Sequence, residues 1–301
     1  MTNLPRVDVV IATRNRPELL AGAVDAVIGQ SYPGHLHLII VFDQSTPDHR
    51  FASTGDRRTV EVIGNHRSPG LAGARNSGID TGSGELVAFC DDDDVWLPEK
   101  VELQVASMLS GSALTCVSGI TVEYGDRSVD RVPGADELNL RNLARNRVMA
   151  AHPSTVMVQR AALATIGLVD EEIPGSYGED FDWILRAAAA GEICVIEQPL
   201  VRVRWGQSQF SREWQTIVDA IDYGLAKHPV FHEDAKALGR LYGRRAFALA
   251  ALHSRGALAA ALRTMRVAPR EKRAYLAAAV ALHLVSAEWL MDLAHRRGHG
   301  I

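Results

Sequence analysis

The chain has 301 residues, of which 47% are hydrophobic and 23% are charged, and its formal net charge is −4. These values exclude a wholly disordered or fibrous chain, and without a basic excess we expect no nucleic-acid partner. Cys90, Cys116 and Cys194 form no CxxC pair, so we expect neither a zinc site nor a disulfide framework. No apolar run reaches ~18 residues and the N-terminal residues do not read as a signal peptide. We therefore expect a cytoplasmic protein without a transmembrane helix.

The first third of the chain alternates short apolar runs with helical patterns. Buried strands are predicted at 7–12, 37–42, 60–63 and 85–90, and helices at 17–30, at 72–81 and after Pro98. Strands that alternate with helices favour an α/β fold, with a mainly parallel sheet flanked by helices. Ligands bind such sheets at the carboxyl ends of the strands, where the polar loops after these runs would gather.

The remainder of the chain is mixed and then helical. Strands are predicted at 115–122, 154–158, 194–196 and 200–203, a helix at 181–190, and an irregular segment at 124–147 that would suit a mobile acceptor loop. From residue 213 onward the alanine-rich sequence predicts helices at 213–227, 234–253, 256–266 and 270–297. We therefore expect two domains, residues 1–210 and a helical region at 211–301.

The most unusual local feature is the acidic run Asp91–Asp94, directly after the predicted strand at 85–90. In an extended chain, residues two apart face the same side, so Asp91 and Asp93 would share one cleft. Two carboxylates ~4 Å apart repel by ~4 kcal/mol at an effective dielectric constant of ~20, and a divalent cation would remove that cost. Oxygen ligands favour Mg²⁺ or Mn²⁺ held together with substrate phosphates. The alternative is a solvated acidic turn in which Asp94 caps the next helix.

Two further motifs allow a catalytic or a structural interpretation. Glu179 and Asp180 precede the helix at 181–190, where they could cap the helix or supply a general base. The small residues of 70–78 allow a ligand to approach the backbone, or serve only helix–sheet packing. No GxGxxG fingerprint, P-loop or HExxH pair occurs in the sequence, which argues against NAD enzymes and P-loop ATPases. His152 is either a surface histidine or a substrate contact.

Taken in order, these elements resemble the family 2 glycosyltransferases of the GT-A (Rossmann-like) fold, over about residues 5–210. The resemblance rests on 7–17, on 41–46, on 70–78, on 89–100, and on 167–171 with 178–180. It implies an enzyme that moves a sugar from a nucleotide-sugar donor with inversion at the anomeric carbon. Such enzymes act in the synthesis of cell-envelope glycoconjugates.

The resemblance also assigns roles to residues of the nucleotide pocket. Thr13 and Arg14 match the exit of the first strand, which lines that pocket, and Asp43 matches the acid that contacts the base. Arg75 and Asn76 match the helix entry beneath the nucleotide.

The resemblance places the acidic run at the DxD motif and the later acid pair at the catalytic base. In that motif Asp91 lies toward the ribose, and Asp93 together with Asp91 holds Mn²⁺ or Mg²⁺ on the diphosphate; we also assign Asp92 to donor binding. Asp180 matches the catalytic base, with Glu179 beside it.

The sequence departs from the family pattern at two places. Trp205 stands where many members have a metal-binding histidine, and tryptophan cannot ligate a metal, so Trp205 would pack under a sugar or fill the core. The loop that carries Asp43 is one residue shorter than usual, so UDP is only the default donor nucleotide. The QxxRW motif of processive synthases lacks its glutamine, which predicts transfer of a single sugar.

The C-terminal helices lie outside the resemblance and leave several partners open. Basic residues bracket an apolar stretch within 270–297, which would suit peripheral contact with the inner face of a membrane, a homodimer interface, or packing inside a helical subdomain. The acceptor could be a glycan, a lipid-linked molecule or a small molecule. A sugar-nucleotidyltransferase and a non-catalytic nucleotide-sugar-binding protein are the alternative functions.

Overall fold

The computed structural model describes residues 4–125, 127–204 and 213–296, and its contacts divide the chain into two units. The first unit consists of 1–140, 148–171 and 179–206. The second consists of 141–147, 172–178 and 207–301. Two short segments that precede residue 210 thus belong with the C-terminal helices.

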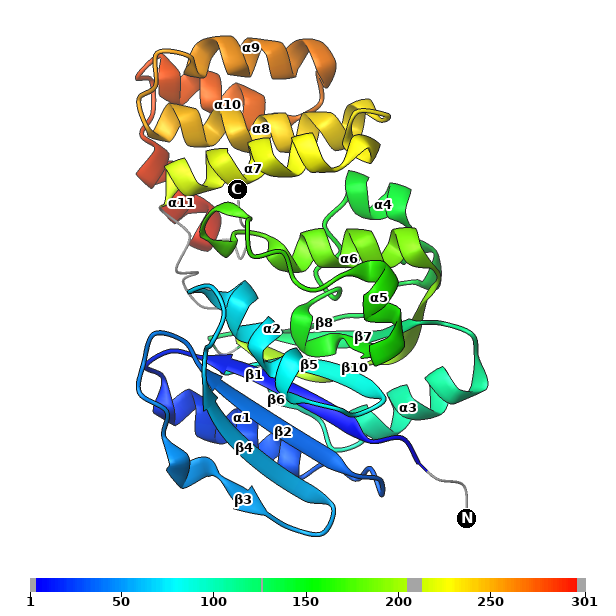
Figure 1. Cartoon of the computed structure of the whole chain (residues 1–301). Coiled ribbons are helices and arrows are strands. Elements are labelled where there is room, and N and C mark those ends of the chain that lie inside the picture. The colour runs from blue at the N-terminus through cyan, green and yellow to red at the C-terminus, as the bar shows by residue number, and fades with distance from the viewer. Residues whose placement is uncertain (1–3, 126, 205–212, 297–301) are drawn as a thin grey trace. The chain divides into compact units, whose positions relative to one another are not determined.

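The first unit is built on a ten-stranded sheet with the order β3-β4-β2-β1-β5-β9-β7-β10-β6, and β8 pairs with β7 (Figure 1). The strands are β1 (Val7–Thr13), β2 (Leu36–Phe42), β3 (Ser53–Thr54), β4 (Arg58–Gly64), β5 (Leu86–Asp91), β6 (Val95–Trp96), β7 (Thr115–Tyr124), β8 (Arg127–Arg131), β9 (Met157–Gln159) and β10 (Ile193–Arg204). Strands β4, β2, β1 and β5 run parallel, and so do β7 and β10. The other pairings are antiparallel, so the sheet is mixed.

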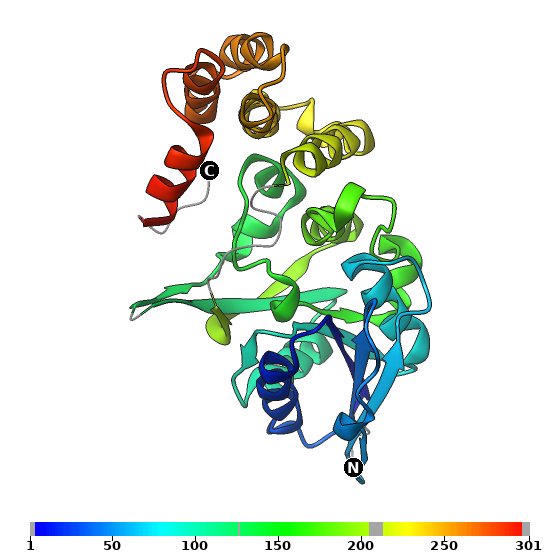
Figure 2. The same ribbon diagram turned by 90° about the vertical axis from the view of Figure 1, so that its left-hand side faces the viewer.

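Helices cover both faces of this sheet, which explains why the central strands are continuous apolar runs (Figure 2). The helices of this unit are α1 (Pro17–Ile28), α2 (Leu71–Thr81), α3 (Lys100–Ser110), α5 (Leu163–Ile166) and α6 (Glu179–Ala190). The buried side chains of α1 and α3 share one core with Val7, Val9 and Ile11 of β1. Helix α2 lies on the other face, where a Cβ on Gly78 would come within 2.3 Å of Val10.

The pairing register brings three polar strand exits to one edge of the sheet. Thr13 at the end of β1 pairs with Phe42 at the end of β2, and Ala12 pairs with Asp91 at the end of β5. Thr13, Asp43 and Asp91 therefore gather at this carboxyl edge, as expected for parallel strands.

The structure corrects the predicted strands after residue 150. The predicted strand at 154–158 is a 3₁₀ turn at Pro153–Thr155 followed by the short β9. The two strands predicted at 194–196 and 200–203 are one strand, β10, whose register shifts around Pro199. Proline has no N–H to donate, so it interrupts the ladder locally without ending the strand.

The second unit contains the C-terminal helices α7 (Trp214–Lys227), α8 (Ala235–Ala251), α9 (Ala257–Val267), α10 (Lys272–Ala281) and α11 (Ala287–Arg296). The short helix α4 (Leu140–Arg145) contributes Arg145, which donates to Asp234, the N-cap of α8. Small side chains fill much of the core, including Ala246, Ala250 and Ala261, so these helices pack closely.

The helix predicted at 270–297 is two helices, because the chain turns at His283. His283 has a φ of 57°, and a pair of hydrogen bonds from His283 and Leu284 back to Val280 and Ala279 closes α10. The Ser286 side chain then accepts from the backbone N–H of Trp289 and caps α11. Among the described residues, no helix has the length and apolar character that spanning a membrane requires.

Candidate active site

The acidic run does not continue β5 but turns. The N–H of Asp94 donates to the carbonyl of Asp91 at 3.2 Å, and Asp92 and Asp93 form the turn. The extended conformation predicted for this run is therefore wrong, whereas the sharing of one cation by Asp91 and Asp93 stays a prediction. Pairing with β1 ends at Asp91, so nothing holds the next residues in an extended conformation.

The turn sorts the four acids into two different pairs. Asp92 and Asp93 each lie 3.1 Å from Nη1 of Arg16. Asp91 and Asp94 both approach the His152 ring, at 3.8 Å from Nε2 and 3.4 Å from Nδ1 respectively. One ligand atom from each of Asp91, Asp94 and His152 lies within 4.8 Å of the other two, which is close enough for all three to contact one cation.

Crowding and burial of the carboxylates raise the pKa of three of them. Burial raises the pKa of Asp92, Asp93 and Asp94, and the negative charge of Asp91 adds to each shift. Asp94 is 1% exposed and accepts from the Ser154 hydroxyl at 2.5 Å. The turn therefore disfavours a full set of negative charges unless a cation is present.

Arg75 joins the acidic run to the Glu-Asp pair of α6. Its Nη2 donates to Asp91 at 2.7 Å and its Nη1 donates to Glu179 at 2.6 Å, and the arginine is 4% exposed. Burial alone would raise the pKa of Asp91, but Arg75, His152 and Arg16 together lower that pKa overall. Burial raises the pKa of Glu179 to about 7 despite Arg75, and the charge of Asp180 adds to the shift.

Asp180 lies half-buried in the first turn of α6, beside Glu179. Its charge acts on both Glu179 and Arg75, so the acid run and the Glu-Asp pair form one electrostatic group. The N-terminal end of a helix attracts negative charge, and Glu179, Asp180 and Asp182 all lie in the first turn of α6.

Thr13, Arg14 and Asp43 lie at the strand exits as predicted. Thr13 donates to Asp92 at 2.7 Å. Burial tends to raise the pKa of Asp43, but hydrogen bonds from Asn65, Gln44 and the Gly70 N–H, with the charge of Arg14, lower it overall. Asp43 is thus held as a carboxylate beside the N-terminus of α2.

Asn76 makes its hydrogen bonds to the protein itself. Its side chain donates to the carbonyl of Val169 and to Glu171, both at 2.7 Å, and accepts from the N–H of Val169 at 2.9 Å. Glu171 in turn accepts from the Ser68 hydroxyl and from Arg67. Asn76 therefore ties α2 to the 167–171 segment, and a contact with the donor stays a prediction. Trp205 lies outside the described residues.

Sequence patterns give no role to Arg16 or Ser154, and they leave His152 open between a surface histidine and a substrate contact. Arg16 follows Arg14 in the same exit loop, and this position is the sequence feature that points to a role for Arg16 at the site. His152 and Ser154 reach the acids because β9 pairs antiparallel with β5, and no local pattern predicted that pairing.

Comparison with known proteins identifies the family. A sequence model described as "Glycosyl transferase family 2" matches residues 8–167, which is more than half of the chain. The chain belongs to this family. The glycosyltransferase is 23% identical over 233 residues to the Escherichia coli enzyme named UDP-Glc:alpha-D-GlcNAc-diphosphoundecaprenol beta-1,3-glucosyltransferase WfgD, an alignment that covers 73% of this chain and 88% of WfgD.

Two solved structures show the same fold as the glycosyltransferase. Residues 1–349 of S. aureus TarS, in complex with UDP-GlcNAc, superpose with a TM-score of 0.61 at 15% identity, covering 98% of this chain and 92% of that TarS fragment. The mannosyltransferase PcManGT from Pyrobaculum calidifontis, in complex with GDP-Man and Mn²⁺, gives a TM-score of 0.57 at 20% identity, covering 94% and 82%. The GT-A fold and the glycosyltransferase class expected from the sequence are thereby confirmed.

Proposed function

We propose that this glycosyltransferase transfers one sugar, with inversion, from a nucleoside-diphosphate sugar to an acceptor hydroxyl. One observation carries the proposal: Arg75 contacts both Asp91 of the acidic run and Glu179 of the Glu-Asp pair, at the edge where strand exits gather. Arg75 thus links Asp91, the proposed donor-binding acid, to Glu179, which is next to Asp180, the proposed proton acceptor. UDP is the expected nucleotide, as in the names of WfgD and the TarS complex.

In the proposed reaction Asp180 accepts the proton of the acceptor hydroxyl as that oxygen attacks the anomeric carbon. Inversion follows because attack and departure take place on opposite faces of the sugar. Glu179, held by Arg75, fixes the start of α6 and thereby the position of Asp180. Thr13, Arg14 and Asp43 would contact the nucleoside from the exits of β1 and β2.

The acidic turn fits Mn²⁺ or Mg²⁺. Its carboxylate oxygens are the ligands these ions prefer. Burial, with the charge of Asp91, raises the pKa of Asp93 and Asp94, and a bound cation would favour their ionised forms. Asp93 and Asp91 would hold the cation, and Asp94 and His152 lie near enough to assist Asp91. When bound, the cation would neutralise charge that develops on the leaving diphosphate.

We also propose a lipid-linked acceptor in cell-envelope synthesis, because the name of WfgD specifies a diphosphoundecaprenol acceptor. Large apolar side chains are exposed in the second unit, with Leu284 71% exposed, Trp289 56% and Leu282 53%. Such side chains suit peripheral contact with the inner face of a membrane, or the homodimer interface that the sequence leaves open.

The decisive experiment replaces Asp180 with asparagine, which keeps the size and removes the base. Transfer from UDP-glucose or UDP-GlcNAc to a synthetic polyprenyl-diphosphate sugar should fall by about 10²–10⁴-fold, while the donor dissociation constant stays unchanged. Asp182→Asn on the same helix is the matched control, because Asp182 is engaged by Arg186 and should matter little for turnover. Near-normal turnover by Asp180→Asn would exclude this residue as the base.

Donor identity is settled by a separate measurement. UDP-, GDP- and dTDP-sugars are compared by thermal shift in the presence of Mn²⁺. A donor at 100 times its dissociation constant should stabilise the fold by about 2.7 kcal/mol. A protein that binds a donor but never hydrolyses or transfers its sugar would instead be the non-catalytic nucleotide-sugar-binding protein.

A further inference from the structure

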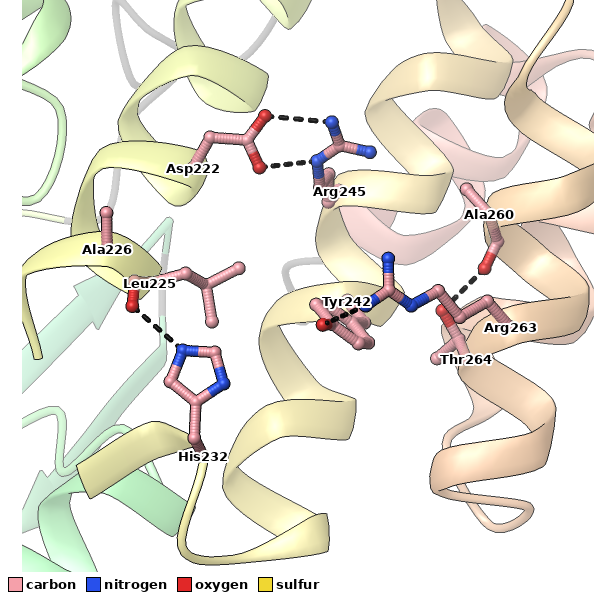
Figure 3. Close-up of a pocket in the computed structure, with 9 residues that line it drawn as sticks. All are labelled: Asp222, Leu225, Ala226, His232, Tyr242, Arg245, Ala260, Arg263 and Thr264. Carbon is pink, nitrogen blue, oxygen red and sulfur yellow. Dashed lines mark hydrogen bonds and ion pairs between the residues drawn. The ribbon is translucent and has the colours of Figure 1, made fainter. Parts of the chain in front are cut away.

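The second unit contains a cavity of about 290 Å³ between α7, α8 and α9 (Figure 3). Two arginines reach it from different helices, Arg245 from α8 and Arg263 from α9. None of the lining residues has a role in the chemistry proposed above. The pairing of each arginine decides what the cavity can bind.

Arg245 is fixed by Asp222 of α7 through two parallel hydrogen bonds. Its Nε donates to Oδ1 at 2.6 Å and its Nη2 donates to Oδ2 at 2.8 Å. This contact uses one edge of the guanidinium and locks its plane. The third nitrogen, Nη1, points away from Asp222 in Figure 3.

Arg263 is held by an aromatic ring rather than by a carboxylate. Its Nη2 donates to the Tyr242 hydroxyl at 2.8 Å, and its guanidinium carbon lies 4.7 Å from the centre of that ring. Within the described ranges, Arg263 forms no ion pair with an acidic side chain. In Figure 3 the terminal nitrogen that Tyr242 does not engage points toward the side of the cavity on which Arg245 lies.

Two further polar side chains of the wall, Thr264 and His232, each form a hydrogen bond with the backbone. The Thr264 hydroxyl donates to the carbonyl of Ala260 at 2.8 Å, and Nε2 of His232 donates to the carbonyl of Leu225 at 2.9 Å. The Tyr242 hydroxyl accepts from Arg263 and keeps its own hydrogen to donate. The cavity therefore offers N–H and O–H donors and a positive charge that Asp222 balances only in part.

We propose that this cavity binds a phosphoryl group, bridged between Arg245 and Arg263. A phosphate oxygen supplies the acceptors and negative charge that the wall lacks, and guanidinium N–H groups suit it in geometry. The volume lies at the lower end of the ~300–1,000 Å³ typical of small-ligand sites. It fits a phosphate or diphosphate group rather than a whole nucleotide sugar. The group belongs either to a soluble phosphate ester or to the headgroup of an anionic lipid.

The test is calorimetric titration of the full chain with inorganic pyrophosphate in the presence of EDTA. Arg263→Gln removes the unpaired charge from an exposed position, so the variant should fold. Arg266→Gln is the matched control, since it makes the same charge change on the same helix but does not line the cavity. We expect Arg263→Gln to weaken the affinity for pyrophosphate about 10- to 100-fold relative to the wild type and to Arg266→Gln.

A second arm distinguishes the two sources of the phosphoryl group. Sedimentation is measured with vesicles of phosphatidylglycerol in phosphatidylcholine and with vesicles of phosphatidylcholine alone. Binding that needs both phosphatidylglycerol and Arg263 identifies a lipid headgroup, whereas loss of pyrophosphate binding without any vesicle effect identifies a soluble phosphate ester. Equal pyrophosphate affinity in Arg263→Gln and Arg266→Gln would overturn the proposal. This outcome is independent of the Asp180→Asn result.

Discussion

Replacing Arg75 with methionine should destabilise the protein, and more so at alkaline than at mildly acidic pH. The guanidinium is 4% exposed and holds Asp91 and Glu179 at 2.7 and 2.6 Å, so methionine would leave two carboxylates without their cation. Removing one partner of a buried ion pair costs about 3–5 kcal/mol. The Asp91 side chain is 25% exposed, so water screens part of its share. We therefore expect a loss of about 3 kcal/mol in the free energy of unfolding near pH 8.

The pH dependence of this loss follows from Glu179, whose pKa rises from an ordinary 4.5 to about 7 in the folded protein. The folded protein then binds more protons than the unfolded chain between these values, so the stabilising contribution is present at low pH and lost as the pH rises through 7. Without Arg75 the pKa of Glu179 rises further. The free energy of unfolding of the variant therefore continues to fall above pH 7, by up to about 1.4 kcal/mol per pH unit.

In the wild type, Asp91 does not make the free energy of unfolding depend on pH between pH 6 and pH 8. Arg75, His152 and Arg16 lower its pKa below 3.8 there, so its stabilising contribution is constant between pH 6 and pH 8. In Arg75→Met, burial would raise the pKa of Asp91, and this change reduces the cost of the substitution at the lower pH, as it does for Glu179. Near pH 6 the Glu179 carboxyl of the variant is protonated and needs no cation. The cost of Arg75→Met should therefore be clearly smaller there than near pH 8.

Urea unfolding with EDTA, at about pH 6 and about pH 8, checks this expectation through the linear dependence of stability on urea. Arg75→Lys should lie between the wild type and Arg75→Met, because one ammonium group cannot replace the two-sided guanidinium. Arg50→Met is the control for a surface pair: Arg50 is 86% exposed beside Asp48, and its loss should change nothing measurable. An equal loss at both pH values, or no loss, would refute the reasoning.

Three further predictions concern packing, burial and metal binding. Gly78→Ala should lower the free energy of unfolding in urea by about 1–3 kcal/mol, because the new Cβ would lie 2.3 Å from Val10. In the control Gly22→Ala the new Cβ would have nothing within 4 Å, so this substitution should stabilise α1 by about 0.5–1 kcal/mol. Burial lowers the pKa of Lys100 from 10.5 to about 7, so the unfolded chain binds more protons than the folded protein between these pH values. The free energy of unfolding should therefore rise with pH in this interval, and Lys100→Met should lack this rise. Mn²⁺ should raise the melting temperature of the wild type with its donor, and both EDTA and Asp93→Ala should abolish that rise.

The sequence predicted best what depends on local pattern. The predicted strands β1, β2, β4 and β5 lie within two residues of the observed ends. For β1, β2 and β5 the reason is that a parallel strand buried on both faces is a continuous apolar run. The sequence does not predict that the run 154–158 divides into a 3₁₀ turn and β9, or that β9 pairs antiparallel with β5. A three-residue strand leaves almost no periodicity to detect. The sequence offers a turn at Asp91–Asp94 only as the alternative to an extended run, because four identical residues do not show where strand pairing ends; Asp94 in that turn is buried, and the N-cap of α3 is Glu99.

For the candidate site, local patterns found the residues but not their contacts. The strand exits pointed to Thr13, Asp43 and Asp91 without any structure, because parallel strands end at one edge. The bond from Arg75 to Glu179 joins residues 104 positions apart, and no spacing rule connects them. His152 reaches Asp91 and Asp94 only through the β9 pairing, so its place beside the acids needed coordinates.

These contacts make α2 the common support of the proposed donor and base sites. Arg75 and Asn76 are neighbours on this helix but serve different partners: Arg75 holds Asp91 and Glu179, and Asn76 holds Val169 and Glu171. Helix α2 also lies so close to β1 that Gly78 leaves no space for a Cβ. Because α2 packs directly on β1, the Arg75 guanidinium extends from a helix that is seated on the sheet, and the position of α2 sets where Arg75 meets the acids. A substitution that shifts α2, including Gly78→Ala, should therefore impair turnover even though Gly78 contacts none of the acids.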